Sequence, residues 1–290
     1  MHMQNILVTG ANGQLGQAIK LIAGNYPAFN FIYTDYQELD ITNASAIAEF
    51  FSQQTIHACI NCAAYTAVDK AEAEEEKAFQ LNFEAALNLA EACLQHSAQL
   101  VHISTDYVFD GRYYRPYSES DEASPQSIYG ASKLRGEAAA LGANPDTVVI
   151  RTSWLYSQFG VNFVKRMKEL MQERPSLNVV FDQVGSPTYA VDLAQVILQV
   201  LVHRQDNPEA AVGGVYHYSN EGVTSWYDFA VTIKELTGSA CEVSPITSDQ
   251  YPTPAQRPAY SVLNKQKIRE TFGIKIPYWR DSLQQCLKQL

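Results

Sequence analysis

Basic residues are scarce in this sequence. Its 290 residues include 21 Lys and Arg against 31 Asp and Glu, which gives a formal net charge of -10. Nucleic-acid binding requires a basic face that displaces the counterions of the phosphate backbone. We therefore expect no nucleic-acid partner. A small anionic ligand remains compatible with this charge, because local backbone donors and one or two cations can hold it.

Long apolar runs and internal repeats are also missing. No stretch approaches the roughly 18 to 20 apolar residues of a membrane span. No repeat or low-complexity segment indicates a solenoid or a linker. The first candidate strand begins at Asn5, almost at the N-terminus, so we expect a cytoplasmic protein without a membrane partner. Hydrophobic residues make up 46% of the chain, which is enough for a sizeable core.

Cysteine is represented by five scattered residues, an odd number that fits reduced thiols better than disulfides. Cys59 and Cys62 form a C-x-x-C pattern, which elsewhere suggests redox or zinc chemistry. Here the pattern lies in an apolar stretch that is typical of a strand, where residues three apart point to opposite faces. We therefore interpret both cysteines as structural and expect no metal site.

Up to about residue 155 the sequence alternates short apolar or β-branched runs with longer helical patterns. This alternation predicts an α/β fold with a Rossmann-type doubly wound parallel sheet. The candidate strands are Asn5–Thr9, Asn30–Thr34, His57–Asn61, Gln99–Ser104 and Thr147–Thr152, and candidate helices start near Gln14, Asn43, Ala71 and Ser127.

Beyond Trp154 the pattern is less regular, and prolines interrupt short helices and strands. We expect residues 1–155 to form a dinucleotide-binding Rossmann domain. Residues 156–290 are expected to form a smaller, loop-rich region that mainly binds substrate, with some segments returning to the sheet. Asn43 is the predicted N-cap of the helix 44–53, and the acidic run 72–76 lies where a helix N-terminus favours negative charge or is simply solvated.

A glycine-rich turn follows the first candidate strand. The segment Thr9-Gly-Ala-Asn-Gly-Gln-Leu-Gly16 places Gly10, Gly13 and Gly16 before an amphipathic helix. One glycine suits the sharp turn, one the close approach of backbone to a pyrophosphate, and one the packing of helix on strand. The free N–H groups of the helix would then bind the phosphates. This pattern predicts a dinucleotide site.

Asp35 closes the second candidate strand, near the spacing expected of an acidic residue that binds the adenosine ribose. Its charge would repel a 2′-phosphate, so we expect NADH or NADPH as cofactor with NADH favoured. A nearby cation would offset that repulsion, and Asp35 is also placed to cap the turn before Asp40.

Tyr129 and Lys133 form a Tyr-x-x-x-Lys pair that a helix places on one face. An ammonium beside a phenol is expected to lower the pKa of Tyr129, which would make it an acid usable near neutral pH. The strand 99–104 leads to Thr105, a hydroxyl at the carboxyl edge of the sheet. Together with the glycine turn, these groups fit hydride transfer to a carbonyl.

These segments resemble the extended short-chain dehydrogenase/reductase superfamily, and within it the enzymes that reduce dTDP-linked 4-keto-deoxysugars. The likeness spans nearly the whole chain and is strongest in Ser104-Thr-Asp-Tyr-Val-Phe-Asp-Gly111 and in the prolines around Arg257. The matching segments are Thr9–Gly16, Asn61–Glu72, Ser104–Gly111, Tyr129–Lys133, Arg151–Tyr156, Asp182–Thr188 and Tyr251–Pro258.

The resemblance implies roles for individual residues. Thr105 would bind the substrate carbonyl, Tyr129 would protonate the alkoxide, and Lys133 would hold the nicotinamide ribose. The implied substrate residues are Thr105, Asp106, Tyr107, Trp154, whose indole would pack on the sugar, and Arg257 at the diphosphate. The cofactor residues are Gly10, Asn12, Gly13, Gln14, Leu15, Gly16, Asp35, Asp40, Ile41, Ala63, Ala64, Tyr65, Thr66, Tyr129 and Lys133.

Other interpretations stay open at this point. Asn82 either orients a proton-relay water or is a surface amide on its helix. The protein is either the expected reductase of a dTDP-sugar, another nucleotide-sugar 4-ketoreductase, or a non-catalytic cofactor-binding regulatory subunit of the same fold. A homodimer is compatible with each of them.

Overall fold

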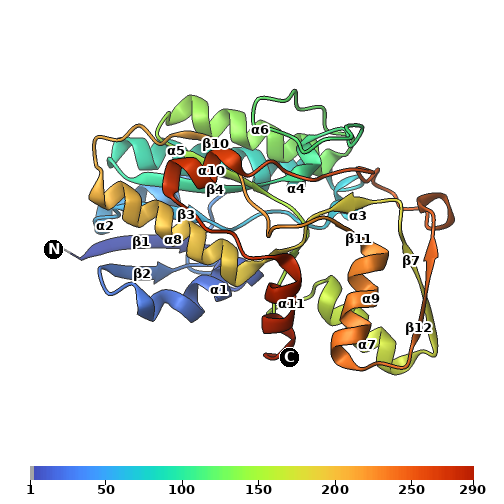
Figure 1. Cartoon of the computed structure of the whole chain (residues 1–290). Coiled ribbons are helices and arrows are strands. Elements are labelled where there is room, and N and C mark those ends of the chain that lie inside the picture. The colour runs from blue at the N-terminus through green and yellow to red at the C-terminus, as the bar shows by residue number, and fades with distance from the viewer. Residues whose placement is uncertain (1–2) are drawn as a thin grey trace.

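Six parallel strands form the central sheet of the computed structural model, which describes residues 3–290 (Figure 1). Their order across the sheet is β2-β1-β3-β4-β5-β10. The strands are β1 (Gln4–Thr9), β2 (Phe29–Tyr33), β3 (Ala58–Asn61), β4 (Gln99–Thr105), β5 (Val148–Thr152) and β10 (Gly214–His217). The chain leaves β1 toward β2 and returns on the other side as β3, so a crevice opens at the carboxyl ends of β1 and β3. The predicted Rossmann-type fold is confirmed.

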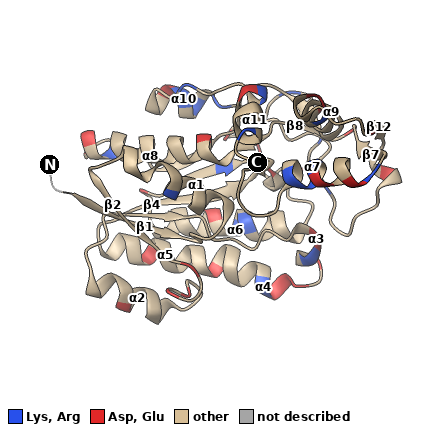
Figure 2. Ribbon diagram, turned by 90° about the horizontal axis from the view of Figure 1, so that it is seen from below, with Lys and Arg blue, Asp and Glu red and all other residues tan. Residues whose placement is uncertain are grey.

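Helices cover both faces of this sheet (Figures 1 and 2). Successive strand residues point to opposite faces, so in β1 Ile6 and Val8 pack in one core while Leu7 packs in the other. The first core holds α1 (Gln14–Ile22), α8 (Ala190–Asp206) and α10 (Gln266–Phe272), and the second holds α2 (Ala44–Gln53), α5 (Ala85–Gln95) and α6 (Ile128–Ala143). Burial on both faces explains why apolar residues point to both sides of the inner strands.

The helix expected near Ala71 is divided. It consists of α3 (Val68–Ala71), α4 (Glu75–Phe79) and a π-helical turn, Gln80–Glu84, that leads into α5. Glu75 and Glu76 occupy the first turn of α4, where the helix N-terminus favours negative charge. The predicted cap of α2 is confirmed, because the side chain of Asn43 accepts hydrogen bonds from the Ser45 and Ala46 N–H groups.

A third core lies beside the carboxyl ends of the sheet strands (Figure 1). It is built from α7 (Phe163–Glu173), α9 (Trp226–Thr237) and α11 (Trp279–Leu287) with the strand pair β7 (Ser176–Val180) and β12 (Glu242–Ile246). Two short pairs connect it to the sheet: β6 (Leu155–Tyr156) with β9 (Thr188–Tyr189), and β8 (Val184–Gly185) with β11 (Thr224–Ser225). Short 3-10 turns span Ala23–Asn25, Asp106–Val108 and Ser248–Gln250. The boundary at residue 155 stays a prediction, while β10 and α8 belong to the sheet and its cover.

All five cysteines are free, and Cys59 is buried in β3. Within residues 3–290 we find no cluster of three or more His, Cys, Asp or Glu side chains placed to hold a metal ion. Across the same residues, none of the helices combines the length and apolarity that crossing a membrane requires.

Candidate active site

A cavity of about 980 Å³ opens at the carboxyl ends of the central strands. Its walls come from the glycine turn, from the ends of β2 to β5 and from the segment after Trp154. Almost every residue predicted for the cofactor and the substrate lines it; Asn12, Gly16 and Arg257 do not. The fold thus brings together residues that are up to about 150 positions apart in the sequence. Ligands of open α/β sheets bind at this place, where the strand order reverses.

The glycine turn is shaped by close backbone contacts. Gly10 has φ +63°, and a Cβ there would lie 2.7 Å from the backbone of Ala63. A Cβ on Gly16 would lie 2.5 Å from the Cα of Ala11, so Gly16 serves helix packing instead of lining the cavity. Gly13 is the N-cap of α1 and has no side chain to cap it, which leaves the first helical N–H groups available for phosphate. These features fit a dinucleotide.

Two carboxylates surround the end of β2. The Asp35 carboxylate accepts hydrogen bonds from the Asn12 N–H (3.0 Å) and the Tyr36 N–H (2.8 Å). Glu38 accepts one from the Asp35 N–H (2.9 Å). Asp35 therefore caps the local turns and also lines the cavity. The Asn12 backbone contributes by holding Asp35 instead of facing the cavity itself.

Asp40 is likewise held by its own turn. Its Oδ1 accepts hydrogen bonds from the Thr42 N–H (3.0 Å) and hydroxyl (2.7 Å). Asp40 and Ile41 line the cavity together with Asp35, and their predicted place near the adenine stays a prediction.

The side chains of Thr105, Asp106 and Tyr129 meet at the end of β4. The Thr105 hydroxyl accepts from the Tyr107 N–H (3.2 Å) and donates to Asp106 Oδ1 (3.1 Å). Asp106 is 2% exposed, its Oδ2 has no partner among the described residues, and burial raises its pKa to about 6. The Tyr107 ring packs edge-on against Tyr129, with centroids 5.4 Å apart.

The pKa of Tyr129 shifts in the direction opposite to the one expected. Desolvation raises the pKa of this phenol to about 12, while a hydrogen bond with the Thr105 side chain lowers it only in part. The predicted lowering by Lys133 is wrong for this structure, because Lys133 Nζ donates to the Ile103 carbonyl at 2.6 Å and is not directed at the phenol. Tyr129 consequently keeps its proton at neutral pH.

Lys133 ends a buried chain of polar groups. The Asn61 Oδ1 accepts from the Thr9 hydroxyl (2.7 Å) and the Ala63 N–H (3.2 Å), so the Asn61 amide N–H₂ faces His102 Nδ1 at 3.1 Å. A neutral His102 then carries its proton on Nε2, which lies 3.5 Å from Lys133 Nζ. Burial, followed by the charge of Lys133, holds the pKa of His102 well below its usual range.

His102 was not among the site residues predicted from the sequence. The available signal was a histidine between the apolar residues Val101 and Ile103 of β4. Lys133 is 2% exposed, and burial lowers its pKa to about 8, against the opposing effect of Glu137. Glu137 is itself paired with Arg151 at 2.7 Å. Burial, together with the charge of Lys133, thus keeps the neighbouring imidazole of His102 neutral.

Asn82 is completely buried, so its interpretation as a surface amide is wrong. It lies in the π-helical turn, a feature found often at functional sites. Its amide accepts from the Tyr65 N–H (2.8 Å) and donates to the Tyr65 carbonyl (3.1 Å) and the Ser132 hydroxyl (3.0 Å). Asn82 therefore ties the loop of Ala63, Ala64, Tyr65 and Thr66 to α6.

Arg257 lies outside the cavity lining. Its guanidinium makes two hydrogen bonds of 2.9 Å with the carboxylate of Asp69. A diphosphate ligand of Arg257 would have to share the guanidinium with Asp69, and the predicted role stays untested. The sequence offered no signal for this pairing, because the two residues are far apart in the chain.

Comparison with known proteins identifies the family of this chain. Residues 3–290 match the family model described as "RmlD substrate binding domain". The dTDP-4-dehydrorhamnose reductase of Aggregatibacter actinomycetemcomitans is 39% identical over 287 residues, covering 97% of each chain. The chain belongs to the dTDP-4-dehydrorhamnose reductase family. The predicted resemblance is confirmed.

Solved structures from this family agree. A dTDP-4-dehydrorhamnose reductase from Clostridium acetobutylicum is 44% identical and covers 98% of this chain and 99% of its own, with a TM-score of 0.92. A dTDP-4-dehydrorhamnose reductase from Bacillus anthracis, solved in complex with NADP, is 37% identical, covers 99% of this chain and 100% of its own, and has a TM-score of 0.93.

Proposed function

We propose that this protein reduces the C4 keto group of dTDP-4-dehydro-β-L-rhamnose with NAD(P)H, giving dTDP-L-rhamnose for cell-surface polysaccharide. The observation that carries the proposal is one cavity that joins the glycine turn to Thr105, Tyr129 and Lys133 in a chain of this family. A reduced nicotinamide supplies the hydride when it is bound.

The residues around the carbonyl site supply the proton and the hydrogen bonds. Tyr129 is protonated at neutral pH, which is the state that an acid must have to protonate an alkoxide. The Thr105 hydroxyl, adjacent to it, donates to the carbonyl oxygen once it releases Asp106 Oδ1. Lys133, which donates to the Ile103 carbonyl and lines the same cavity, would hold the nicotinamide ribose.

The cofactor preference is part of the proposal. Asp35 and Glu38 bring two carboxylates to the end of β2, and both would repel a 2′-phosphate. We therefore expect NADH to be favoured, although the Bacillus anthracis relative was solved with NADP. We also expect a cytoplasmic enzyme and infer no specific oligomer.

Turnover by the purified protein tests the proposal. Oxidation of NADH or NADPH is followed with dTDP-4-dehydro-β-L-rhamnose and, in parallel, with other dTDP- and UDP-linked 4-ketosugars. Selective turnover of the rhamnose precursor is the expected result. A faster reaction with another ketosugar would reassign the substrate, and tight cofactor binding without any turnover would indicate a regulatory subunit.

A further inference from the structure

Two stacked tryptophans lie where the sheet meets the substrate region. Trp154 follows β5 and Trp226 begins α9; their ring centroids are 3.6 Å apart and their planes differ by 10°. Trp154 lines the cavity, whereas Trp226 does not. We propose that Trp226 is a positioning residue that holds the Trp154 indole as a fixed wall of the sugar site. This inference rests on the proposed function.

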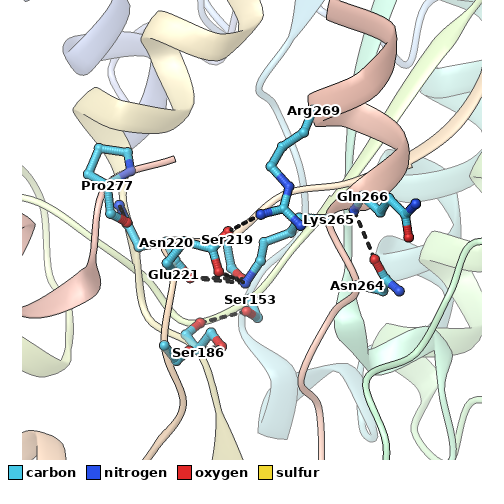
Figure 3. A network of polar contacts seen from close by, with 11 residues as sticks. Ser153, Ser186, Ser219, Asn220, Glu221, Asn264, Lys265, Gln266, Arg269 and Pro277 are labelled. Atoms are coloured by element: carbon cyan, nitrogen blue, oxygen red, sulfur yellow. Dashed lines mark hydrogen bonds and ion pairs between the residues drawn. The ribbon is translucent and has the colours of Figure 1, made fainter. Parts of the chain in front are cut away.

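The backbone of Trp154 is held in an unfavourable conformation. Its φ is +48°, in the left-handed region that non-glycine residues rarely adopt. Hydrogen bonds on both sides maintain it: the Ser153 hydroxyl donates to the Ser186 carbonyl (2.7 Å; Figure 3), and the Thr188 N–H donates to the Trp154 carbonyl (3.1 Å). The segment 186–188 therefore sets the direction in which the indole leaves the chain.

The space beside the indole depends on Gly185. A Cβ on Gly185 would lie 2.7 Å from Cε2 and 2.8 Å from Cζ2 of Trp154. Gly185 pairs with Thr224 in the β8–β11 ribbon, two residues before Trp226. The β8–β11 ribbon thus leaves room for the Trp154 ring at Gly185 and leads directly into Trp226, whose ring stacks on that of Trp154.

Trp226 is itself held by local structure. Ser225 caps α9 in a reciprocal capping box with Asp228, and the Phe163 ring lies 4.6 Å from the ring of Trp226. These contacts come from the substrate region and leave the stacked face of Trp226 directed at Trp154.

The loop before Trp226 is anchored by a buried lysine (Figure 3). Lys265, 6% exposed, contacts the Asn220 carbonyl at 3.3 Å and Glu221 at 3.4 Å. The Ser186 hydroxyl donates to the Gly222 carbonyl at 2.6 Å. This network joins the loop that leads to Trp226 with the segment that sets the Trp154 backbone.

The stack leaves the sugar one face or edge of the Trp154 indole, because Trp226 covers the other face. An indole that is already immobilised loses little side-chain entropy when the sugar binds. Removal of Trp226 should therefore weaken sugar binding more than it slows the chemical step. The expected change is in KM for the dTDP-sugar, with cofactor affinity unaffected.

Steady-state kinetics of Trp226→Leu and Trp226→Phe, with Tyr227→Leu as control, test the inference. Tyr227 packs on the core of the substrate region and is not part of the stack, so its variant reports general loosening. Trp226→Leu should raise KM for the dTDP-sugar about tenfold, the scale of one lost aromatic pair, while Trp226→Phe retains most of the affinity. Gly185→Ala, which displaces the indole from the ribbon side, should raise KM as well.

Circular dichroism of the coupled indoles follows the stack without relying on activity. The chain has three tryptophans, and the third, Trp279, packs on Phe229. The exciton signal should disappear in Trp226→Leu and persist in Tyr227→Leu. An unchanged KM in Trp226→Leu, or an equal rise in Tyr227→Leu, would overturn the inference. Absence of turnover in the unmodified protein would instead overturn the proposed function while the exciton signal still reports the stack.

Discussion

The dinucleotide end and the sugar end of the cavity are assembled in different ways. At the dinucleotide end, the glycine turn follows β1 directly and Asp35 follows β2, so both lie within the first βαβ segment of the chain. At the sugar end, Trp154, Gly185 and Trp226 come from three distant segments. The first arrangement is visible as sequence spacing, whereas the second depends on how the substrate region packs against the sheet.

The largest effect should come from the point where the two ends meet. Tyr129→Phe removes the proposed acid and should lower kcat by about 10²–10⁴-fold. Affinity for NAD(P)H, measured by fluorescence titration, should change little. A variant that keeps its full rate would mean that another group, such as the buried Asp106, delivers the proton.

The dinucleotide end should be sensitive to a single methyl group. Gly10→Ala introduces a Cβ 2.7 Å from the Ala63 backbone at φ +63° and should destabilise the protein by about 1–3 kcal/mol. We expect a large loss of NADH affinity in addition. Gly24→Ala is the matched control, because a Cβ there meets nothing within 4 Å. Equal cofactor affinity in both variants would contradict the close approach that we assign to Gly10.

Exchange of the ribose carboxylate should have a smaller effect. Asp35→Ser removes a charge that opposes a 2′-phosphate and should shift the ratio of kcat/KM for NADH over NADPH toward NADPH by about tenfold. Glu38→Gln tests the second carboxylate and should shift the ratio less. No change in either variant would show that other groups set the preference.

The pH dependence should give the smallest change. Lys133 loses its proton as the pH rises through about 8. If the reaction requires the charged amine, kcat/KM should fall above that pH. His102→Asn keeps an acceptor for Asn61 but removes the Nε2–H that faces Lys133. Loss of that N–H favours the charged form of Lys133, so the decline of kcat/KM should begin at a higher pH. An identical profile in the two proteins would exclude His102 from tuning Lys133.

Much of the dinucleotide half could be predicted from the sequence. Each central strand predicted up to residue 155 is present with small shifts at its ends, and Asn43 caps α2, because these features depend on neighbouring residues. The pKa of Tyr129 could not be predicted, because it depends on burial and because Lys133 is directed at the Ile103 carbonyl. The buried position of Asn82 and the pairing of Arg257 with Asp69 likewise need contacts between distant segments.

The sequence by itself determined the alternation of strands and helices, the glycine turn before α1 and the chemical groups at the end of β4. Each is encoded by short-range spacing and by residues whose backbone preferences are intrinsic. Tertiary structure decided which charges are buried and how the pKa values of Tyr129 and Lys133 shift. It also decided which face of the Trp154 indole is covered by Trp226. Desolvation and side-chain stacking are properties of neighbours in space, and those neighbours come together only when segments distant in the sequence have packed against one another.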